Sequence, residues 1–349
     1  MKNLIRKSVV EIDGYVPGEQ PKGEEIIKLN TNENPYLCSP EVDDILRELD
    51  VSTLAKYPDP LCVEVRKVIA EKHEVGLDNT FAGNGSDEIL ALCIRAFAER
   101  DGGSVGYFDP SYSLYPVLAR IEEIETRPVA LDDNFEWQMP DGYEASVFFL
   151  ANPNAPTSLL FPKDKVEAFV KDFAGVVVID EAYVDFSREH CMEFATKYDN
   201  VIVTRTLSKS YALAGIRFGY CVGNKELIDA LYKIKDSYNL NTITQELARV
   251  ALLDEGTMEA VTAAVKGSRG LFATELKELG FKVYPSETNF LWVKPPKPGA
   301  KKIFEELRSR KVFTRWFDGD RTKDYLRITI GTNDQMLALV DALEEILGK

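Results

Sequence analysis

The chain has 349 residues, of which 45% are hydrophobic, and it carries a formal net charge of −15. At roughly 100–200 residues per domain, this length suggests two domains or one large α/β unit with an appendage. The negative charge argues against binding to nucleic acid or to anionic membranes, because its field repels phosphate over a long range. Phosphorylated small molecules remain candidate substrates, since a few arginines at one site can bind them.

The N-terminal residues lack the apolar core of a signal peptide, and no segment approaches the roughly 18 consecutive apolar residues of a membrane span. The five cysteines form no C-x-x-C pair and their number is odd, which is typical of a reducing compartment. We therefore expect a cytoplasmic protein with no membrane partner. The two histidines, His73 and His190, argue against a histidine zinc site or a Ser-His-Asp triad. An enzyme of this composition is expected to use lysine, tyrosine, aspartate or a cofactor, and no metal.

The first 35 residues hold no periodic pattern and several prolines and glycines, so we expect an N-terminal arm over residues 1–35. Apolar residues at helical spacing then predict a helix over 86–98. Short apolar runs bounded by turn residues predict strands at 104–108, 147–150, 176–179, 201–206 and 218–222. Runs of this kind between helices predict a large, doubly wound α/β domain with a mostly parallel sheet, over residues 36–245.

Near residue 250 the pattern changes to a long helix, expected over 258–280. A strand at 289–293, a helix at 300–310, a strand at 325–329 and a helix at 334–347 follow. The proline-rich segment 295–298 is expected to turn without regular structure. This pattern predicts a smaller C-terminal α/β domain over residues 246–349.

The strongest chemical signal follows the apolar run at 201–206. Thr206, Ser208 and Lys209 come at its end, and Arg217 lies eight residues beyond the lysine. The two hydroxyls and the guanidinium could converge on one anion, because arginine offers a planar fork of donors. A lysine beside a bound phosphate is placed as in a site for pyridoxal 5′-phosphate, where it forms a Schiff base and later moves protons.

A second polar group follows the run at 176–179. Asp180 is expected at the carboxyl end of a parallel strand, where open α/β sheets bind ligands. A carboxylate there could keep a pyridine nitrogen protonated, although an aspartate at this place could also simply cap a helix. Tyr183, three residues on, could donate a hydrogen bond to the phenolic oxygen of the same cofactor.

Two further groups could complete such a site. Gly85, Ser86 and Asp87 open the helix expected at 86–98, and free N–H groups at a helix start can bind phosphate. Tyr112 follows the strand expected at 104–108 and could stack on the pyridine ring, although an isolated tyrosine is more often a packing residue.

Together these elements resemble the fold-type I pyridoxal-phosphate aminotransferases, and the resemblance spans nearly the whole chain. More narrowly, the sequence resembles the histidinol-phosphate aminotransferase family. The supporting segments are YVPG at 15–18, LNTNENP at 29–35, KYPDP at 56–60, NGSDE at 84–88 and LRITIGT at 326–332.

The resemblance implies a role for each matching residue. Lys209 matches the Schiff-base lysine, Asp180 the partner of the pyridine nitrogen and Tyr183 the phenolic-oxygen donor. The cofactor-binding residues implied are Tyr57, Gly85, Ser86, Asp87, Tyr112, Asn154, Thr206, Ser208 and Arg217, and the substrate-binding residues are Tyr15, Asn32, Arg315 and Arg327. Tyr57 matches a tyrosine that reaches the cofactor phosphate of a neighbouring subunit, which implies a homodimer.

The implied reaction is amino-group transfer between L-histidinol phosphate and 2-oxoglutarate. One segment departs from the family pattern, because relatives commonly have Asn-Asn-Pro-Thr-Gly where this chain has Asn154-Ala155-Pro156-Thr157-Ser158. Ala155 cannot contact the phenolic oxygen, so either Asn154 substitutes or that bond is lost. Two alternatives stay open: an aminotransferase for an aromatic or other amino acid, and a pyridoxal-phosphate decarboxylase of the phosphothreonine type.

Overall fold

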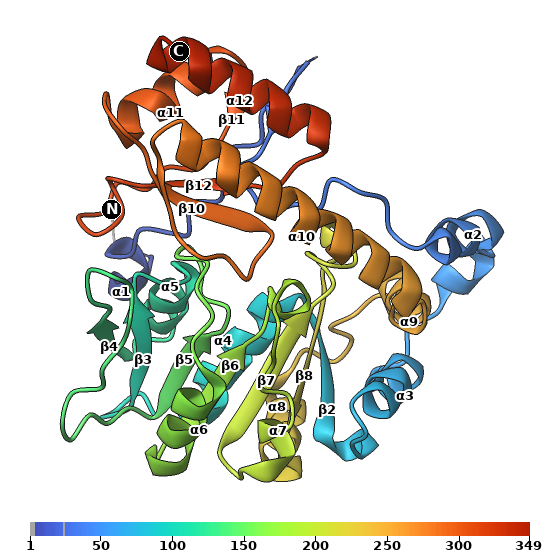
Figure 1. Ribbon diagram of the computed structural model, residues 1–349. Coiled ribbons are helices and arrows are strands. Elements are labelled where there is room, and N and C mark those ends of the chain that lie inside the picture. The colour runs from blue at the N-terminus through green and yellow to red at the C-terminus, as the bar shows by residue number, and fades with distance from the viewer. Residues whose placement is uncertain (1–3, 24) are drawn as a thin grey trace.

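The structure, a computed structural model, describes residues 4–23 and 25–349 (Figure 1). Residues 1–3 and 24 of the expected arm lie outside this part. The largest sheet has seven strands, in the spatial order β2 (Thr80–Asn84), β8 (Phe218–Gly223), β7 (Val201–Thr206), β6 (Val176–Asp180), β5 (Val147–Ala151), β3 (Ser104–Asp109) and β4 (Glu125–Ala130). β8 is antiparallel to both of its neighbours, and the other adjacent strands are parallel. The expectation of a mostly parallel sheet is confirmed.

Alternate residues of the central strands face two different cores, as strand geometry requires. In β5, Phe148 and Leu150 pack in one cluster, whereas Val147 and Phe149 pack in another. The first face is covered by α3 (Val63–Lys72), α6 (Lys163–Asp172), α7 (Phe194–Lys197) and α9 (Thr242–Leu253). The second is covered by α4 (Ser86–Phe97), α5 (Leu114–Ile121) and α8 (Lys225–Ile234). Helices on both faces make this a doubly wound sheet, as expected.

A second body lies against one end of the large sheet and is built mainly from the C-terminal third of the chain (Figure 1). It contains an antiparallel sheet in the order β12 (Leu326–Thr329), β10 (Phe290–Lys294), β9 (Lys282–Val283). The helices are α10 (Glu255–Glu278), α11 (Ala300–Ser309) and α12 (Asn333–Leu347). Phe272, Ile303 and Leu339 join these helices in one buried core.

Residues 27–29 of the N-terminal segment join this second body. β1 (Ile27–Lys28) pairs in parallel with β11 (Val312–Phe313), and Leu29 is buried in the same core. Two further helices precede the large sheet, α1 (Lys7–Val10) and α2 (Pro40–Glu48), together with the 3₁₀ turns Val51–Ala55 and Leu77–Asn79. The other 3₁₀ turns are Val184–Phe186 and Ala214–Ile216. In the described part of the chain, no helix has the length and apolar character that a membrane crossing needs.

Capping explains where the C-terminal helices begin. The carboxylate of Asp254 accepts the N–H of Thr257, so α10 starts three residues before the expected position. Thr332 and Gln335 form a reciprocal capping box at the start of α12. The proline-rich segment 295–298 lies between β10 and α11 and has no helix or strand, as expected.

Candidate active site

A cavity of about 290 Å³ lies where the carboxyl ends of β5, β6 and β7 meet the second body. Three parts of the chain line it: residues of the N-terminal segment, the loops that follow the large-sheet strands, and the region of β12. Most of the residues expected at the site contribute to its wall, namely Tyr15, Asn32, Ser86, Asp87, Tyr112, Asp180, Tyr183, Thr206, Ser208, Lys209, Arg217, Arg315 and Arg327.

One end of the cavity is a cluster of anion-binding donors. Arg217 Nη2 lies 3.1 Å from Asp87 Oδ2, and its Nη1 lies 3.5 Å from Ser208 Oγ. The hydroxyl of Thr206 donates to Ser208 Oγ at 2.9 Å. The first turn of α4, which Ser86 opens, adds backbone N–H groups that no residue of that helix accepts.

Two glycines leave the space that this cluster needs. A Cβ on Gly85 would lie 2.6 Å from Arg217 Nη2, and a Cβ on Gly219 would lie 2.4 Å from the backbone nitrogen of Ser86. Gly85 also has a φ of +78°, a conformation that favours glycine. Although Gly85 does not line the cavity, its missing side chain is what lets Arg217 approach the start of α4.

Asp180 ends β6 and is buried at the floor of the cavity. Its Oδ2 accepts the hydroxyl of Tyr115 at 2.8 Å, and its Oδ1 accepts the N–H of Ala182 at 3.2 Å. Burial raises the pKa of Asp180 to about 6, and the two hydrogen bonds oppose this rise. Sequence reasoning missed Tyr115, because it lies in an apolar helix where a tyrosine indicates only packing.

A buried ion pair lies directly behind this floor. Glu181 follows Asp180, and its Oε2 is 2.8 Å from Arg205 Nη2. Arg205 precedes Thr206 on β7, so the pair joins the end of β6, which carries Asp180, to the end of β7, which leads into the Lys209 loop. The Glu181 side chain has no solvent exposure.

Lys209 and Tyr183 lie side by side above the floor. Lys209 Nζ is 5.7 Å from the centre of the Tyr183 ring. The amide of Asn34 donates to the carbonyl oxygen of Lys209 at 2.8 Å and so holds the lysine loop from the N-terminal segment. Asn32, from the same segment, donates to the hydroxyl of Tyr183 at 2.8 Å.

Two arginines from the region of β12 form the wall that the second body contributes to the cavity. The backbones of Arg315 and Arg327 pair with each other, and their guanidinium carbons lie 5.1 and 5.4 Å from the centre of the Phe317 ring. Arg327 donates to the carbonyl of Asn30 at 2.9 Å, and burial lowers its pKa. Among the residues that the structure describes, neither guanidinium has a carboxylate within ion-pair distance.

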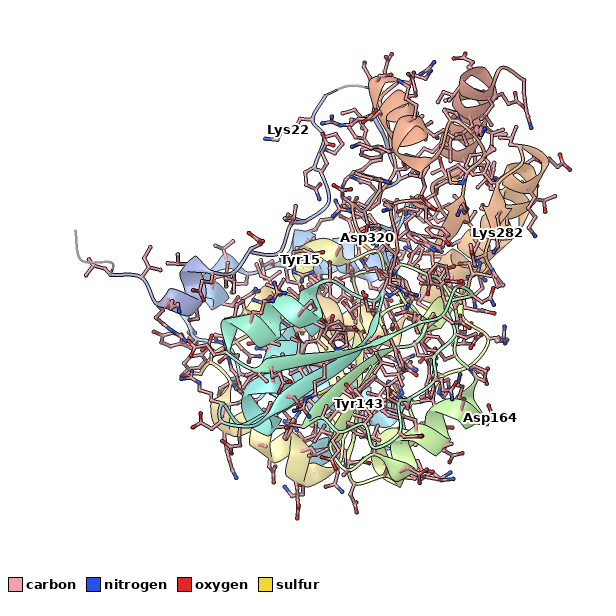
Figure 2. All side chains as sticks on the ribbon, turned by 90° about the vertical axis from the view of Figure 1, so that its left-hand side faces the viewer. Tyr15, Lys22, Tyr143, Asp164, Lys282 and Asp320 are labelled. Atoms are coloured by element: carbon pink, nitrogen blue, oxygen red, sulfur yellow. The ribbon has the colours of Figure 1, made fainter. Side chains whose placement is uncertain are left out.

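The N-terminal segment covers the cavity from one side. Arg315 donates to the carbonyls of Val16 and Pro17 at 3.3 and 3.4 Å. The ring of Tyr15 meets the ring of Tyr112 edge-on, with 6.0 Å between the centroids. Figure 2 shows Tyr15 on this segment, where it passes between the two bodies of the molecule. Tyr112 in turn donates to Asp87 at 3.2 Å.

Asn154 and Tyr57 do not line the cavity. The amide nitrogen of Asn154 donates to the carbonyl of Pro110 at 3.1 Å and to the hydroxyl of Thr157 at 2.8 Å. Both amide protons are therefore used inside the protein, and none is left for a ligand. Tyr57 is 81% exposed and stacks on Tyr238, with 4.5 Å between the ring centroids.

The residues present fit pyridoxal 5′-phosphate. The donor cluster around Arg217 suits its phosphate, the buried carboxylate of Asp180 suits its ring nitrogen, and the amine of Lys209 suits its aldehyde. No group of three histidine, cysteine or acidic side chains in residues 4–23 and 25–349 has the arrangement of a metal site.

Comparison with known proteins identifies the family. The model for aminotransferase class I and II matches residues 24–343. Histidinol-phosphate aminotransferase 1 of Trichormus variabilis is 41% identical, with 99% of this chain and 100% of the relative covered. The histidinol-phosphate aminotransferase of Chromohalobacter salexigens is 42% identical, with 99% of each chain covered.

Solved structures show the same fold. That of histidinol-phosphate aminotransferase from Sinorhizobium meliloti in complex with pyridoxal-5′-phosphate has a TM-score of 0.84 and 25% identity, covering 92% of this chain and 90% of the other. An L-threonine-O-3-phosphate decarboxylase from Porphyromonas gingivalis has a TM-score of 0.81 and 23% identity, covering 92% and 99%. The chain therefore belongs to the class I and II aminotransferase family and is a pyridoxal-phosphate-dependent transaminase.

Proposed function

We propose that this transaminase exchanges an amino group between L-histidinol phosphate and 2-oxoglutarate, giving imidazole acetol phosphate and L-glutamate in histidine biosynthesis. The full-length relatives at about 40% identity carry this activity in their names. The observation in the cavity that supports it is the pair of arginines, Arg315 and Arg327, which lack a carboxylate partner among the described residues. A phosphate in one half-reaction and a carboxylate in the other can both be held there.

Each residue around the cofactor has a proposed task. When bound, the cofactor supplies a ring that accepts electrons from an attached amine and so makes its α-proton acidic. Asp180 holds the proton on the ring nitrogen, and Tyr183 donates to the phenolic oxygen. The amine of Lys209 removes the α-proton and returns a proton one carbon away. The phosphate is held by Arg217, Ser208, Thr206 and the N–H groups of Ser86 and Asp87, and Tyr112 stacks on the ring.

The substrate side of the cavity uses the remaining residues. Arg327 binds the carboxylate of the amino donor glutamate, and Arg315 with Tyr15 binds the phosphate of histidinol phosphate. Asn154 is left out of this proposal, because both of its amide protons are already donated within the protein.

A panel of amines tests the substrate. Each candidate is added to the holoenzyme, and conversion of the cofactor to its amine form is followed by absorbance. We expect histidinol phosphate and glutamate to convert it fastest, and the variant Arg315→Ala to weaken histidinol phosphate more than glutamate. Faster conversion by an aromatic amino acid, or release of CO₂ from phosphothreonine, would replace this assignment by one of the two alternatives.

We further propose a homodimer that acts in the cytoplasm. Tyr57 is exposed and lies outside the cavity of its own chain, which suits a side chain that reaches the cofactor phosphate of a partner. The five cysteines form no disulfide, which suits a reducing compartment. Mixing an inactive Lys209→Ala protein with an inactive Tyr57→Ala protein is expected to restore activity after subunit exchange. A fully active monomer in sedimentation would contradict the shared site.

A further inference from the structure

Asn32 is clamped to β12 through two hydrogen bonds with one side chain. Its backbone N–H donates to Thr329 Oγ1 at 3.0 Å, and the hydroxyl of Thr329 donates to Asn32 Oδ1, also at 3.0 Å. A backbone N–H can only donate, so the threonine oxygen must accept, and its own proton is left for Oδ1. The amide of Asn289 also donates to the carbonyl of Asn32, at 2.9 Å. All three residues are buried, and Asn32 has a φ of +57°.

This clamp decides which way the Asn32 amide faces. Because Oδ1 is used as an acceptor toward Thr329, the NH₂ group is the end that faces Tyr183, where Nδ2 lies 2.8 Å from the hydroxyl oxygen. The tyrosine oxygen therefore accepts this bond, and its single proton is left to be donated elsewhere. The structure shows no other hydrogen bond of this hydroxyl within the described residues, and Tyr183 lines the cavity.

We propose that Thr329 and Asn32 are positioning residues that fix the hydrogen-bond direction of Tyr183, so that its hydroxyl donates into the cavity. The inference rests on the proposed role of Tyr183 as the donor to the cofactor's phenolic oxygen. Without the threonine proton, the Asn32 amide is free to turn over and present its oxygen, and Tyr183 then donates to Asn32 instead.

The hydrogen-bonded series Thr329–Asn32–Tyr183, called the relay below, also joins the cofactor to the substrate side of the cavity. Arg327 lies two residues before Thr329 on β12, and it donates to the carbonyl of Asn30. The N–H of Thr329 donates to the carbonyl of Leu29 at 3.0 Å. The strand that carries the proposed substrate arginine therefore lies along the segment that orients Tyr183.

The relay has a spectroscopic consequence that needs no substrate. A donor to the phenolic oxygen stabilises its anionic form, so it lowers the pH at which the lysine-bound cofactor loses its proton. Other ionisable groups face Tyr183 as well: Lys209 from the loop after β7, Arg327 from β12, and Tyr112 and Tyr115 from the α5 region. None of them hydrogen-bonds to the Thr329 side chain in the described chain.

The test is a pH titration of the absorbance of the holoenzyme without any amine. Thr329→Val keeps the shape of the side chain and removes the hydroxyl, and we expect the midpoint to rise by roughly 0.4–1 pH unit, the size of one hydrogen bond. Thr329→Ser is expected to restore the midpoint. Thr314→Val is the matched control, because Thr314 is also buried and its hydroxyl has no hydrogen-bond partner in the described chain.

A double-mutant cycle separates the relay from a general loosening of the site. Tyr183→Phe removes the donor itself, so adding Thr329→Val to it is expected to cause no further shift. Additive shifts, or a midpoint in Thr329→Val equal to that of the unaltered enzyme, would overturn the proposal. If Thr329→Val does not hold the cofactor, Thr329→Ala, which also removes the hydroxyl, is titrated in its place against the same controls. The titration contains no substrate, so a negative result in the amine panel would not change its outcome. A negative titration would likewise leave the substrate assignment unchanged.

Discussion

The substitution Tyr115→Phe isolates the hydrogen bond that Tyr115 donates to Asp180 at 2.8 Å. A bond to a charged acceptor is worth roughly 1.5–3 kcal/mol and one to a neutral acceptor roughly 0.5–1.5 kcal/mol. Losing this hydrogen bond therefore destabilises the carboxylate of Asp180 by about 1–1.5 kcal/mol more than it destabilises the carboxylic acid. At 1.36 kcal/mol per unit, this raises the pKa of Asp180 from about 6 to about 7.

The sign of the effect on stability follows from the protons bound. In the folded, cofactor-free protein the pKa of Asp180 is above its value of about 3.9 in the unfolded chain, so the folded state binds more protons between these values. Its stability falls as the pH rises through this range, and in Tyr115→Phe the fall continues for about one unit more. The stability deficit of the variant is therefore expected to grow by about 1–1.5 kcal/mol between roughly pH 5 and pH 8.

Denaturant unfolding of the cofactor-free proteins at several pH values measures this growth. Tyr143→Phe is the matched control, because the Tyr143 hydroxyl donates to the carbonyl of Arg127, a neutral acceptor, on the large body (Figure 2). Its deficit is expected to stay constant with pH. A constant deficit in Tyr115→Phe as well would refute the reasoning, since it would mean that Tyr115 supports Asp180 by packing alone.

Three further outcomes are expected. Borohydride reduction of the holoenzyme followed by peptide mapping should place the pyridoxyl group on Lys209, and a label on another lysine would contradict the assignment. Arg217→Ala removes a charged donor from the proposed phosphate cluster, so it should weaken cofactor binding roughly 10- to 100-fold in equilibrium titrations; unchanged affinity would place the phosphate elsewhere. Glu181→Gln removes the nearer of the two carboxylates that face Arg205, while Asp185 Oδ1 stays 3.9 Å from its Nη1, and should lower the free energy of unfolding by roughly 1.5–3 kcal/mol, whereas a loss below roughly 0.5 kcal/mol would show that Asp185 alone satisfies the arginine.

The elements that the sequence predicts well are those whose signal is local. The strand expected at 201–206 has these same bounds in the structure, because all six residues are buried and the run is continuously apolar at its start. Asp180 and Lys209 line the cavity, as predicted, because polar residues that follow such runs lie at the carboxyl ends of the parallel strands. β4 was not predicted, since it lies at the edge of the sheet and most of its residues are partly exposed.

The parts of the site that sequence reasoning missed depend on the direction of hydrogen bonds across the fold. Nothing local distinguishes Thr329, which orients Asn32, from Thr314, whose hydroxyl has no partner among the described residues. The geometry of segment 154–158 could not be predicted either, because Ser158 adopts a φ of 64° and its hydroxyl donates to the carbonyl of Pro285 at 2.9 Å. Such contacts exist only once distant segments have come together.

The pairing of β1 with β11 has a consequence for the order in which the cavity is completed during synthesis. Residues 27–28 are synthesised long before their partners at 312–313. The strands of the large sheet are complete by residue 223, so a sheet can form long before the cavity has its second wall. A nascent chain can therefore be folded in its larger part, with Lys209 and Asp180 in place, and still lack the wall that carries Arg315 and Arg327. The substrate side of the cavity is complete only when the segments at 27–28 and 312–313 have paired.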